Sequence, residues 1–337
     1  MTRLPVSIIT GFLGSGKTTL IANLLRKPEM AGTGVIVNEF AALGIDDLVL
    51  GAERQDGGEV ILLKNGCVCC APNDDLTTSI LRLQRNLTAS SAGSARLLIE
   101  TSGLADPVTL LHRLMRDLRL RTSIRLAGVV GLVDAVNGLS QLDAHEVSLK
   151  QIAIADRLII SKNDLVAPER VEQLKQRLHA INPGSPLIVG QADAQADASL
   201  LDGGLYNEQR GELDPLRWLS LPAYRQRGPA HKELFQSWLI ESDSAVRWDR
   251  FTELMGPLIM RENNGLLRLK GLVNTFGDDA PLVIHGVQND FHRPVRLARW
   301  PDARRRTMIV VIGHASAAAT VDGIRKALAD CTADSPA

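Results

Sequence analysis

The chain lacks both a long apolar run and an excess of charge of either sign. Its 337 residues include 38 basic and 38 acidic side chains, so nothing indicates a surface for a polyanion, and nucleic acid is excluded as the main partner. No apolar stretch approaches the ~20 residues that a membrane-spanning helix needs, and no signal peptide precedes the first predicted strand. We therefore expect a cytoplasmic protein without a membrane partner.

Cysteine and histidine are both scarce, and only the cysteines are clustered. Three of the four cysteines are Cys67, Cys69 and Cys70. In a cytoplasmic protein such crowding indicates metal or redox chemistry before it indicates disulfides. The seven histidines have neither helical i, i+4 spacing nor zinc-finger spacing, and they form no His-rich tract, so surface or structural roles are expected for most of them.

The strongest motif lies near the start of the chain. An apolar run, residues 6–10, leads into G-F-L-G-S-G-K-T-T, which satisfies G-x-x-x-x-G-K-[ST] between a strand and a helix-forming stretch. This loop is typical of nucleotide phosphate binding, where backbone N–H groups and the helix dipole face an anion. The expected phosphate-binding residues are Gly11, Gly14, Ser15, Gly16, Lys17, Thr18 and Thr19, with the Thr18 hydroxyl also on Mg²⁺. A plain glycine-rich turn with a solvated lysine is the weaker alternative.

Apolar strands alternate with helices over the first half of the chain. This order predicts an α/β fold, a P-loop NTPase domain whose mostly parallel sheet is covered by helices on both faces. The polar motifs follow strand ends, which is where open α/β sheets bind ligands. Composition changes near residue 191, so we expect this domain over residues 1–192, a linker over 193–228 and a small C-terminal α+β domain over 229–337.

Two further motifs suit a guanine nucleotide: one fits the base, and the other fits Mg²⁺ and the γ-phosphate. Ser161-Lys162-Asn163-Asp164 follows a predicted strand and is close to N-K-x-D, in which the carboxylate accepts from two guanine donors and the lysine stem covers the base. A solvated turn is the alternative. Glu100 ends another buried strand and is the natural carboxylate for Mg²⁺, and Gly103 fits the place where a backbone N–H would sense the γ-phosphate.

The loop after the second predicted strand contains Glu39 and Asp46, where a nucleotide-sensing switch should lie. Asp46 is therefore a candidate catalytic residue beside Lys17, Thr18 and Glu100, although a plain surface loop would also carry such acids.

The cysteine motif C-V-C-C can present three soft thiolate ligands to Zn²⁺ or a neighbouring transition metal. Three protein ligands leave a fourth position for Glu39, water or a thiol of a recipient protein, and such an open site suits transfer of the metal. A redox pair, or buried cysteines that act as small hydrophobes, are the alternatives.

In order, the chain contains G-F-L-G-S-G-K-T-T, N-E-F, N-G-C-V-C-C, E-T-S-G-L-A-D-P, V-D-A and S-K-N-D, and in this it resembles the CobW-like P-loop GTPases. Its tail, with R-L-K-G at 268–271, Trp300 and residues 306–313, is similar to the C-terminal domain of that family. The resemblance implies a GTP-hydrolysing metallochaperone that binds zinc or cobalt and delivers it to a client metalloprotein or a cofactor pathway. A homodimer is compatible with this function.

The resemblance also assigns roles by position. It implies that the transition-metal ligands are Cys67, Cys69, Cys70 and, as an accessory, Glu39. Lys17, Thr18 and Glu100 would then serve the phosphates of GTP and Mg²⁺, and Asp164 would serve guanine. Two residues depart from the family pattern: Ala41 replaces a glycine in the switch loop, and Ser161 replaces the asparagine or threonine of the base motif.

We expect a coupled switch, in which GTP and Mg²⁺ order residues 39–47 and tighten the thiolate site, and hydrolysis releases the metal. Basal hydrolysis should be slow, because neither an arginine finger nor an activated glutamine is evident. The rival functions are a P-loop ATPase or kinase acting on a small molecule, against which Lys162 and Asp164 argue, and a GTP-binding regulatory scaffold.

Overall fold

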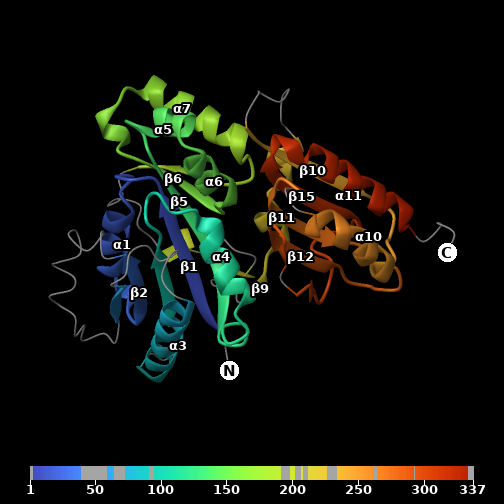
Figure 1. Ribbon diagram of the computed structural model, residues 1–337, viewed down its shortest axis with the longest axis horizontal. Coiled ribbons are helices and arrows are strands. Elements are labelled where there is room, and N and C mark those ends of the chain that lie inside the picture. Colours follow the sequence, from blue (N-terminus) through green and yellow to red (C-terminus); the bar gives the residue numbers. More distant parts are fainter. Residues whose placement is uncertain are drawn as a thin grey trace. The chain divides into compact units, whose positions relative to one another are not determined.

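A computed structural model describes residues 3–38, 59–63, 73–90, 95–190, 198–201, 206–207, 212–225, 234–261, 264–291 and 293–332. The chain folds into two compact units, one comprising Met1–Arg177 with Ser185–Arg210 and the other Leu178–Gly184 with Gly211–Ala337 (Figure 1). The boundaries expected from the sequence, 1–192, 193–228 and 229–337, stay a prediction. Among the described helices, none has both the length and the apolar character needed to cross a bilayer.

The first unit is built on a seven-stranded parallel sheet with the order β3-β2-β4-β1-β5-β6-β7. The strands are β1 Leu4–Gly11, β2 Thr33–Asn38, β3 Val60–Leu63, β4 Arg96–Glu100, β5 Ile124–Asp134, β6 Arg157–Ser161 and β7 Leu187–Val189. The central strands are almost continuously aliphatic and buried, as strands covered on both faces must be. This confirms the predicted α/β fold.

Helices cover both faces of this sheet. They are α1 Lys17–Leu25, α3 Asn73–Ser90, α4 Pro107–Arg116, α5 Gly138–Ala144, α6 Glu146–Ile154 and α7 Pro168–Ile181. The described residues of this unit also form the short 3-10 helices η1 Pro28–Met30, η3 Asn163–Leu165 and η4 Ala198–Leu201. The leucines of α1 and η4 join one core cluster with aliphatic residues of β1, β2, β4, β5 and β6. On the opposite face, Gly34 of β2 packs against leucines of α3, and Gly131 of β5 packs against α6.

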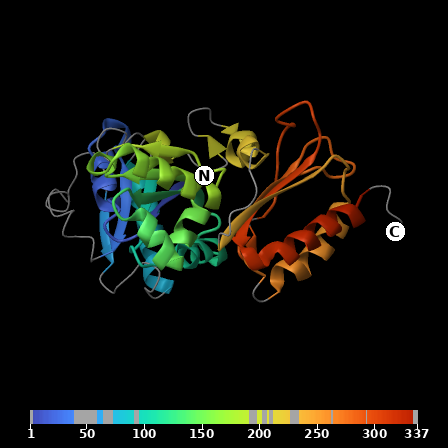
Figure 2. The same cartoon turned by 90° about the horizontal axis from the view of Figure 1, so that it is seen from above.

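The second unit is an α+β fold, as expected. Its six-stranded sheet has the order β10-β15-β11-β12-β13, with β14 beside β12. Its long strands pair antiparallel with their neighbours. The strands are β10 Phe235–Ser242, β11 Leu266–Val273, β12 Leu282–Val287, β13 Asp290–Phe291, β14 Val295–Arg296 and β15 Thr307–His314. Helices α10 Trp248–Met260 and α11 Ala318–Asp330, the latter preceded by the 3-10 helix η5 Ala315–Ala317, share a core cluster with one face of the sheet. Figure 2 shows these two helices side by side on that face.

Part of the segment predicted as a linker carries regular elements. These are β8 Tyr206–Asn207, β9 Glu212–Leu213, α8 Pro215–Leu219 and α9 Leu221–Arg225. Trp218 of α8 is buried, its ring meets that of His285 edge-on with centroids 5.5 Å apart, and Lys270 places its Nζ 5.0 Å from the Trp218 ring centroid. The second unit therefore extends upstream of its first long strand, and α8 packs against its sheet.

Candidate nucleotide-binding site

The loop between β1 and α1 adopts a conformation that requires glycine. Gly11, Gly14 and Gly16 have φ values of 143°, 71° and 92°. A Cβ on Gly11 would lie only 2.4 Å from the carbonyl oxygen of Leu132. Among the described residues no side chain caps the start of α1 at Lys17, so its first amide groups are available to an anion. The predicted phosphate-binding loop thus has the backbone geometry that it needs.

Lys17 lies inside this loop with its ammonium group turned onto the backbone. Its Nζ donates to the carbonyl oxygens of Gly11, at 2.8 Å, and Phe12, at 3.1 Å. Burial lowers the pKa of Lys17, while the charge of Glu100 acts in the opposite direction. An ammonium has three donors, so one remains for a phosphate while the two carbonyl bonds persist.

Thr18 and Glu100 are brought together from α1 and the end of β4. The Thr18 hydroxyl donates to Glu100 Oε1 at 2.8 Å. Glu100 is 2% exposed, and burial raises the pKa of its carboxyl despite opposing effects of the Thr18 hydrogen bond and the Lys17 charge. Its buried Oε2 has no hydrogen-bond partner in the part of the chain that the structure describes. A hydroxyl and a buried carboxylate with an unused oxygen are hard oxygen ligands that fit Mg²⁺.

The loop after β4 packs directly on the phosphate-binding loop. The Thr101 amide donates to the Ile9 carbonyl at 3.0 Å, and the hydroxyls of Thr101 and Thr10 are 2.9 Å apart. A Cβ on Gly103 would lie 2.6 Å from the backbone nitrogen of Leu13. Gly103, expected from the sequence to sense the γ-phosphate, therefore lies against the phosphate-binding loop.

The base motif reaches the same loop from the end of β6. Lys162 has a left-handed backbone, φ 55°, which is uncommon outside glycine and frequent at functional sites. Its Nζ is 2.9 Å from Asp134 Oδ2 and about 4.0 Å from the place where a Cβ on Gly14 would be. Asp164 follows in η3 and is exposed. The lysine thus lies beside the phosphate-binding loop, and the exposed Asp164 carboxylate can accept hydrogen bonds from a ligand.

Asp134 belongs to the site although it was not among the residues predicted for it. Its side chain is 1% exposed and accepts hydrogen bonds from Lys162, from Asn137 and from the amide of Val136. Burial by itself would raise the pKa of Asp134, but these hydrogen bonds outweigh it and hold the pKa below its usual value. A carboxylate at the carboxyl end of a buried strand is the signal that marks such a residue.

Ser161 stands where the N-K-x-D motif has asparagine, yet its side chain still hydrogen-bonds to the phosphate-binding loop. Its hydroxyl donates to the carbonyl oxygen of Ser15 at 2.7 Å and lies 3.4 Å from that of Val133. The shorter side chain therefore still joins β6 to the phosphate-binding loop, and the departure from asparagine does not detach the base motif.

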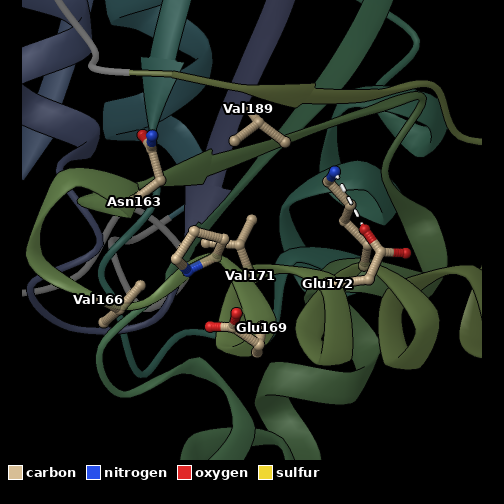
Figure 3. Close-up of a pocket in the computed structure, with 8 residues that line it drawn as sticks. Asn163, Val166, Glu169, Val171, Glu172 and Val189 are labelled. Atoms are coloured by element: carbon tan, nitrogen blue, oxygen red, sulfur yellow. Dashed lines mark hydrogen bonds and ion pairs between the residues drawn. The ribbon is translucent and has the colours of Figure 1, made fainter.

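A shallow cavity of about 500 Å³ adjoins the base motif (Figure 3). It is lined by residues of η3, of the connection that follows it, of α7 and of β7, namely Asn163, Val166, Pro168, Glu169, Val171, Glu172, Lys175 and Val189. Lys175 pairs with Glu172 at its rim, at 3.3 Å. Neither Lys162 nor Asp164 lines it, so the cavity lies beside the base-reading residues.

Five predicted site residues lie outside the described part of the chain: Glu39, Asp46, Cys67, Cys69 and Cys70. Within the described residues, no group of three or more His, Cys, Asp or Glu side chains is arranged to hold a metal. Strands β2 and β3 are parallel neighbours, with Asn38 opposite Leu63. The carboxyl ends of β2 and β3 therefore lie at the same edge of the sheet.

Two family models together match most of the chain. They are "CobW/HypB/UreG, nucleotide-binding domain" over residues 5–189 and "Cobalamin synthesis protein cobW C-terminal domain" over residues 235–332. The zinc chaperone YjiA of Escherichia coli K12 is 30% identical, with 93% of this chain and 95% of the relative covered. The zinc chaperone CobW of a Sinorhizobium species is 27% identical, with 92% and 93% covered.

The fold agrees with these sequence matches. The crystal structure of Zn(II)-bound YjiA GTPase from E. coli superposes with a TM-score of 0.69 at 26% identity, covering 98% of this chain and 99% of that one. Since both family matches, the whole-length relatives and the fold agree with the loop geometry described above, the chain belongs to the CobW family of P-loop GTPases.

Proposed function

We propose that the protein is a GTP-hydrolysing metallochaperone that carries a divalent transition metal, zinc rather than cobalt, to a client metalloprotein or cofactor pathway. The observation that supports the GTPase part best is the contact of Thr18 with Glu100 beside the phosphate-binding loop. The zinc part is supported by the C-x-C-C motif at Cys67–Cys70 and by relatives that are named zinc chaperones.

The phosphates of GTP would bind at the loop of residues 11–19. One ammonium hydrogen of Lys17, together with the amides at the start of α1, faces them. Thr18 and Glu100 would hold Mg²⁺, which would supply neutralisation of the phosphate charge. The role of this chain is thus to orient the phosphates and to stabilise the charge that develops during transfer to water.

Guanine would be read by Asp164 and covered by the stem of Lys162. The ion pair of Lys162 with buried Asp134 holds the lysine head group beside the phosphate-binding loop, so less side-chain freedom would be lost when a nucleotide binds.

Asp164→Asn is expected to weaken GTP binding by about 10- to 100-fold, because two hydrogen bonds to a charged acceptor are lost. The amide of asparagine can instead donate to the C2 carbonyl oxygen of xanthine, so binding of XTP should improve. Displacement of a fluorescent GDP analogue by GTP, XTP and ATP measures both changes. Asp143→Asn, at an exposed acid of α5, is the matched control. Unchanged GTP affinity in Asp164→Asn would remove Asp164 from the base site.

The metal would bind through Cys67, Cys69 and Cys70 with Glu39 as an accessory ligand. Adjacent strands β2 and β3 lead into the segments that contain Glu39 and the cysteines. That adjacency supports a link between the nucleotide-sensing loop, with Asp46, and the thiolate site. Coupling of this kind is reciprocal, so GTP must change zinc affinity by the same factor as zinc changes GTP affinity.

A direct test of the proposed function is competition for zinc between the protein and a chromogenic chelator. We expect the wild-type protein to bind zinc at least about fivefold more tightly with Mg²⁺ and a non-hydrolysable GTP analogue than with Mg²⁺ and GDP. Titration of the nucleotides with and without zinc should return the same factor. Equal zinc affinities in the two nucleotide states would contradict gating by GTP. That result would not bear on whether the protein hydrolyses GTP.

A further inference from the structure

Helix α6 contacts the loop between β4 and α4, which contains Gly103. The side-chain amide of Gln151 donates to the carbonyl oxygens of Gly103, at 3.1 Å, and Ala105, at 3.4 Å. One position earlier, Lys150 Nζ lies 3.3 Å from Asp106 Oδ2. These contacts join α6 to the residues that lead from Glu100 into α4.

The contacts of Gln151 are the stronger of the two because they are buried. Gln151 is 1% exposed, and both of its amide hydrogens are directed to these carbonyls. The Lys150 pair is partly exposed on both sides and therefore contributes less. Loss of the Gln151 donors would remove a hydrogen-bond donor from two backbone carbonyls in a buried site, which is costly.

The residues that Gln151 holds form a turn. The Ala105 amide donates to the Ser102 carbonyl at 3.0 Å, which closes the turn Ser102–Ala105 with Gly103 inside it. Gly103 is in contact with Leu13 of the phosphate-binding loop on one side and is held through its carbonyl by Gln151 on the other. The turn is therefore clamped between the phosphate-binding loop and α6.

We propose that Gln151 is a positioning residue for the terminal phosphate of the nucleotide. By holding the turn Ser102–Ala105, it directs the Gly103 N–H toward the γ-phosphate and so favours GTP over GDP. The inference rests on the proposed function, since it assigns Gly103 to the γ-phosphate. The β-phosphate and the base depend on other groups, namely the loop of residues 11–19 and the base motif 161–164, neither of which Gln151 contacts through its side-chain amide.

The test is Gln151→Met, which keeps the length of the side chain and removes its donors. With Mg²⁺ present, the Kd of a non-hydrolysable GTP analogue should rise about tenfold, as expected for one or two lost hydrogen bonds, while the Kd of GDP changes less than about twofold. Gln176→Leu, at an exposed glutamine of α7, is the control for loss of an amide. The GDP titration also reports whether the variant is folded.

Gln151→Glu is a second variant, which tests the inference even if Gln151→Met does not fold. Its carboxylate would repel the same two carbonyls, so it should give the same GTP-selective loss. If both nucleotides weaken equally, or neither weakens, Gln151 has only a structural role and the inference is overturned. Failure of the wild-type protein to bind guanine nucleotides would instead overturn the proposed function, so the two failures are distinguishable.

Discussion

Glu100→Gln is expected to lower the rate of GTP hydrolysis by about 10²–10³-fold, the usual effect of removing one electrostatic group from a transition-state site. Glutamine has the size of glutamate and can still accept from the Thr18 hydroxyl, but it lacks the charge that would hold Mg²⁺. Phosphate release under single-turnover conditions measures the rate. Binding of GDP should persist, since the backbone amides of the loop and the base motif are unchanged.

The matched control is Glu169→Gln, which removes an exposed carboxylate beside the base motif and should leave hydrolysis unchanged. Hydrolysis by Glu100→Gln within about twofold of wild type would exclude Glu100 from the Mg²⁺ site. Failure to bind GDP would show that the substitution has disturbed the loop more widely.

The same substitution should not destabilise the nucleotide-free protein. Burial raises the folded-state pKa of Glu100, so the folded protein binds more protons than the unfolded chain between the two pKa values. Its contribution to stability is therefore present below the unfolded pKa and is lost as pH rises through the folded pKa. Glutamine does not titrate, so the variant does not lose this stability as pH rises. Without Mg²⁺, the Tm of Glu100→Gln minus the Tm of the wild-type protein should therefore be larger at pH 7.5 than at pH 5.

Replacing Cys67, Cys69 and Cys70 together by alanine is expected to weaken zinc binding by at least about 10³-fold, because thiolate ligands provide most of the free energy of binding at such sites. Chelator competition measures the change. Nucleotide binding should be retained, since the loop of residues 11–19 and the base motif are built from other strands.

Cys331→Ala is the matched control for the loss of a cysteine. Cys331 is free and buried in the second unit, and burial raises the pKa of its thiol, which disfavours the thiolate that binds zinc. Its replacement should leave zinc affinity unchanged. If the triple variant keeps wild-type zinc affinity, the cysteine motif does not carry the metal and its redox alternative becomes the next hypothesis.

Short elements are where prediction from the sequence failed. Helices α5, α8 and α9, of 7, 5 and 5 residues, were not anticipated. A helix of fewer than two or three turns shows too little periodicity to be recognised, and its formation depends on packing instead. Trp218 illustrates this, because its burial against the sheet residues His285 and Lys270 is a contact between segments far apart in the chain.

Local sequence was sufficient for the phosphate-binding loop, for the long strands and helices, and for placing polar motifs at strand ends, because each depends on neighbouring residues. Which of those motifs lie close together in space was decided by the tertiary structure. Strand β4 pairs with β1, with Glu100 opposite Ile9, and this brings Glu100 to Thr18 across 82 residues of sequence. Likewise, only the packing of β5, β6 and α6 brings Asp134 to Lys162 and Gln151 to Gly103. Strand order follows from which apolar faces bury each other, and that is a property of the whole domain.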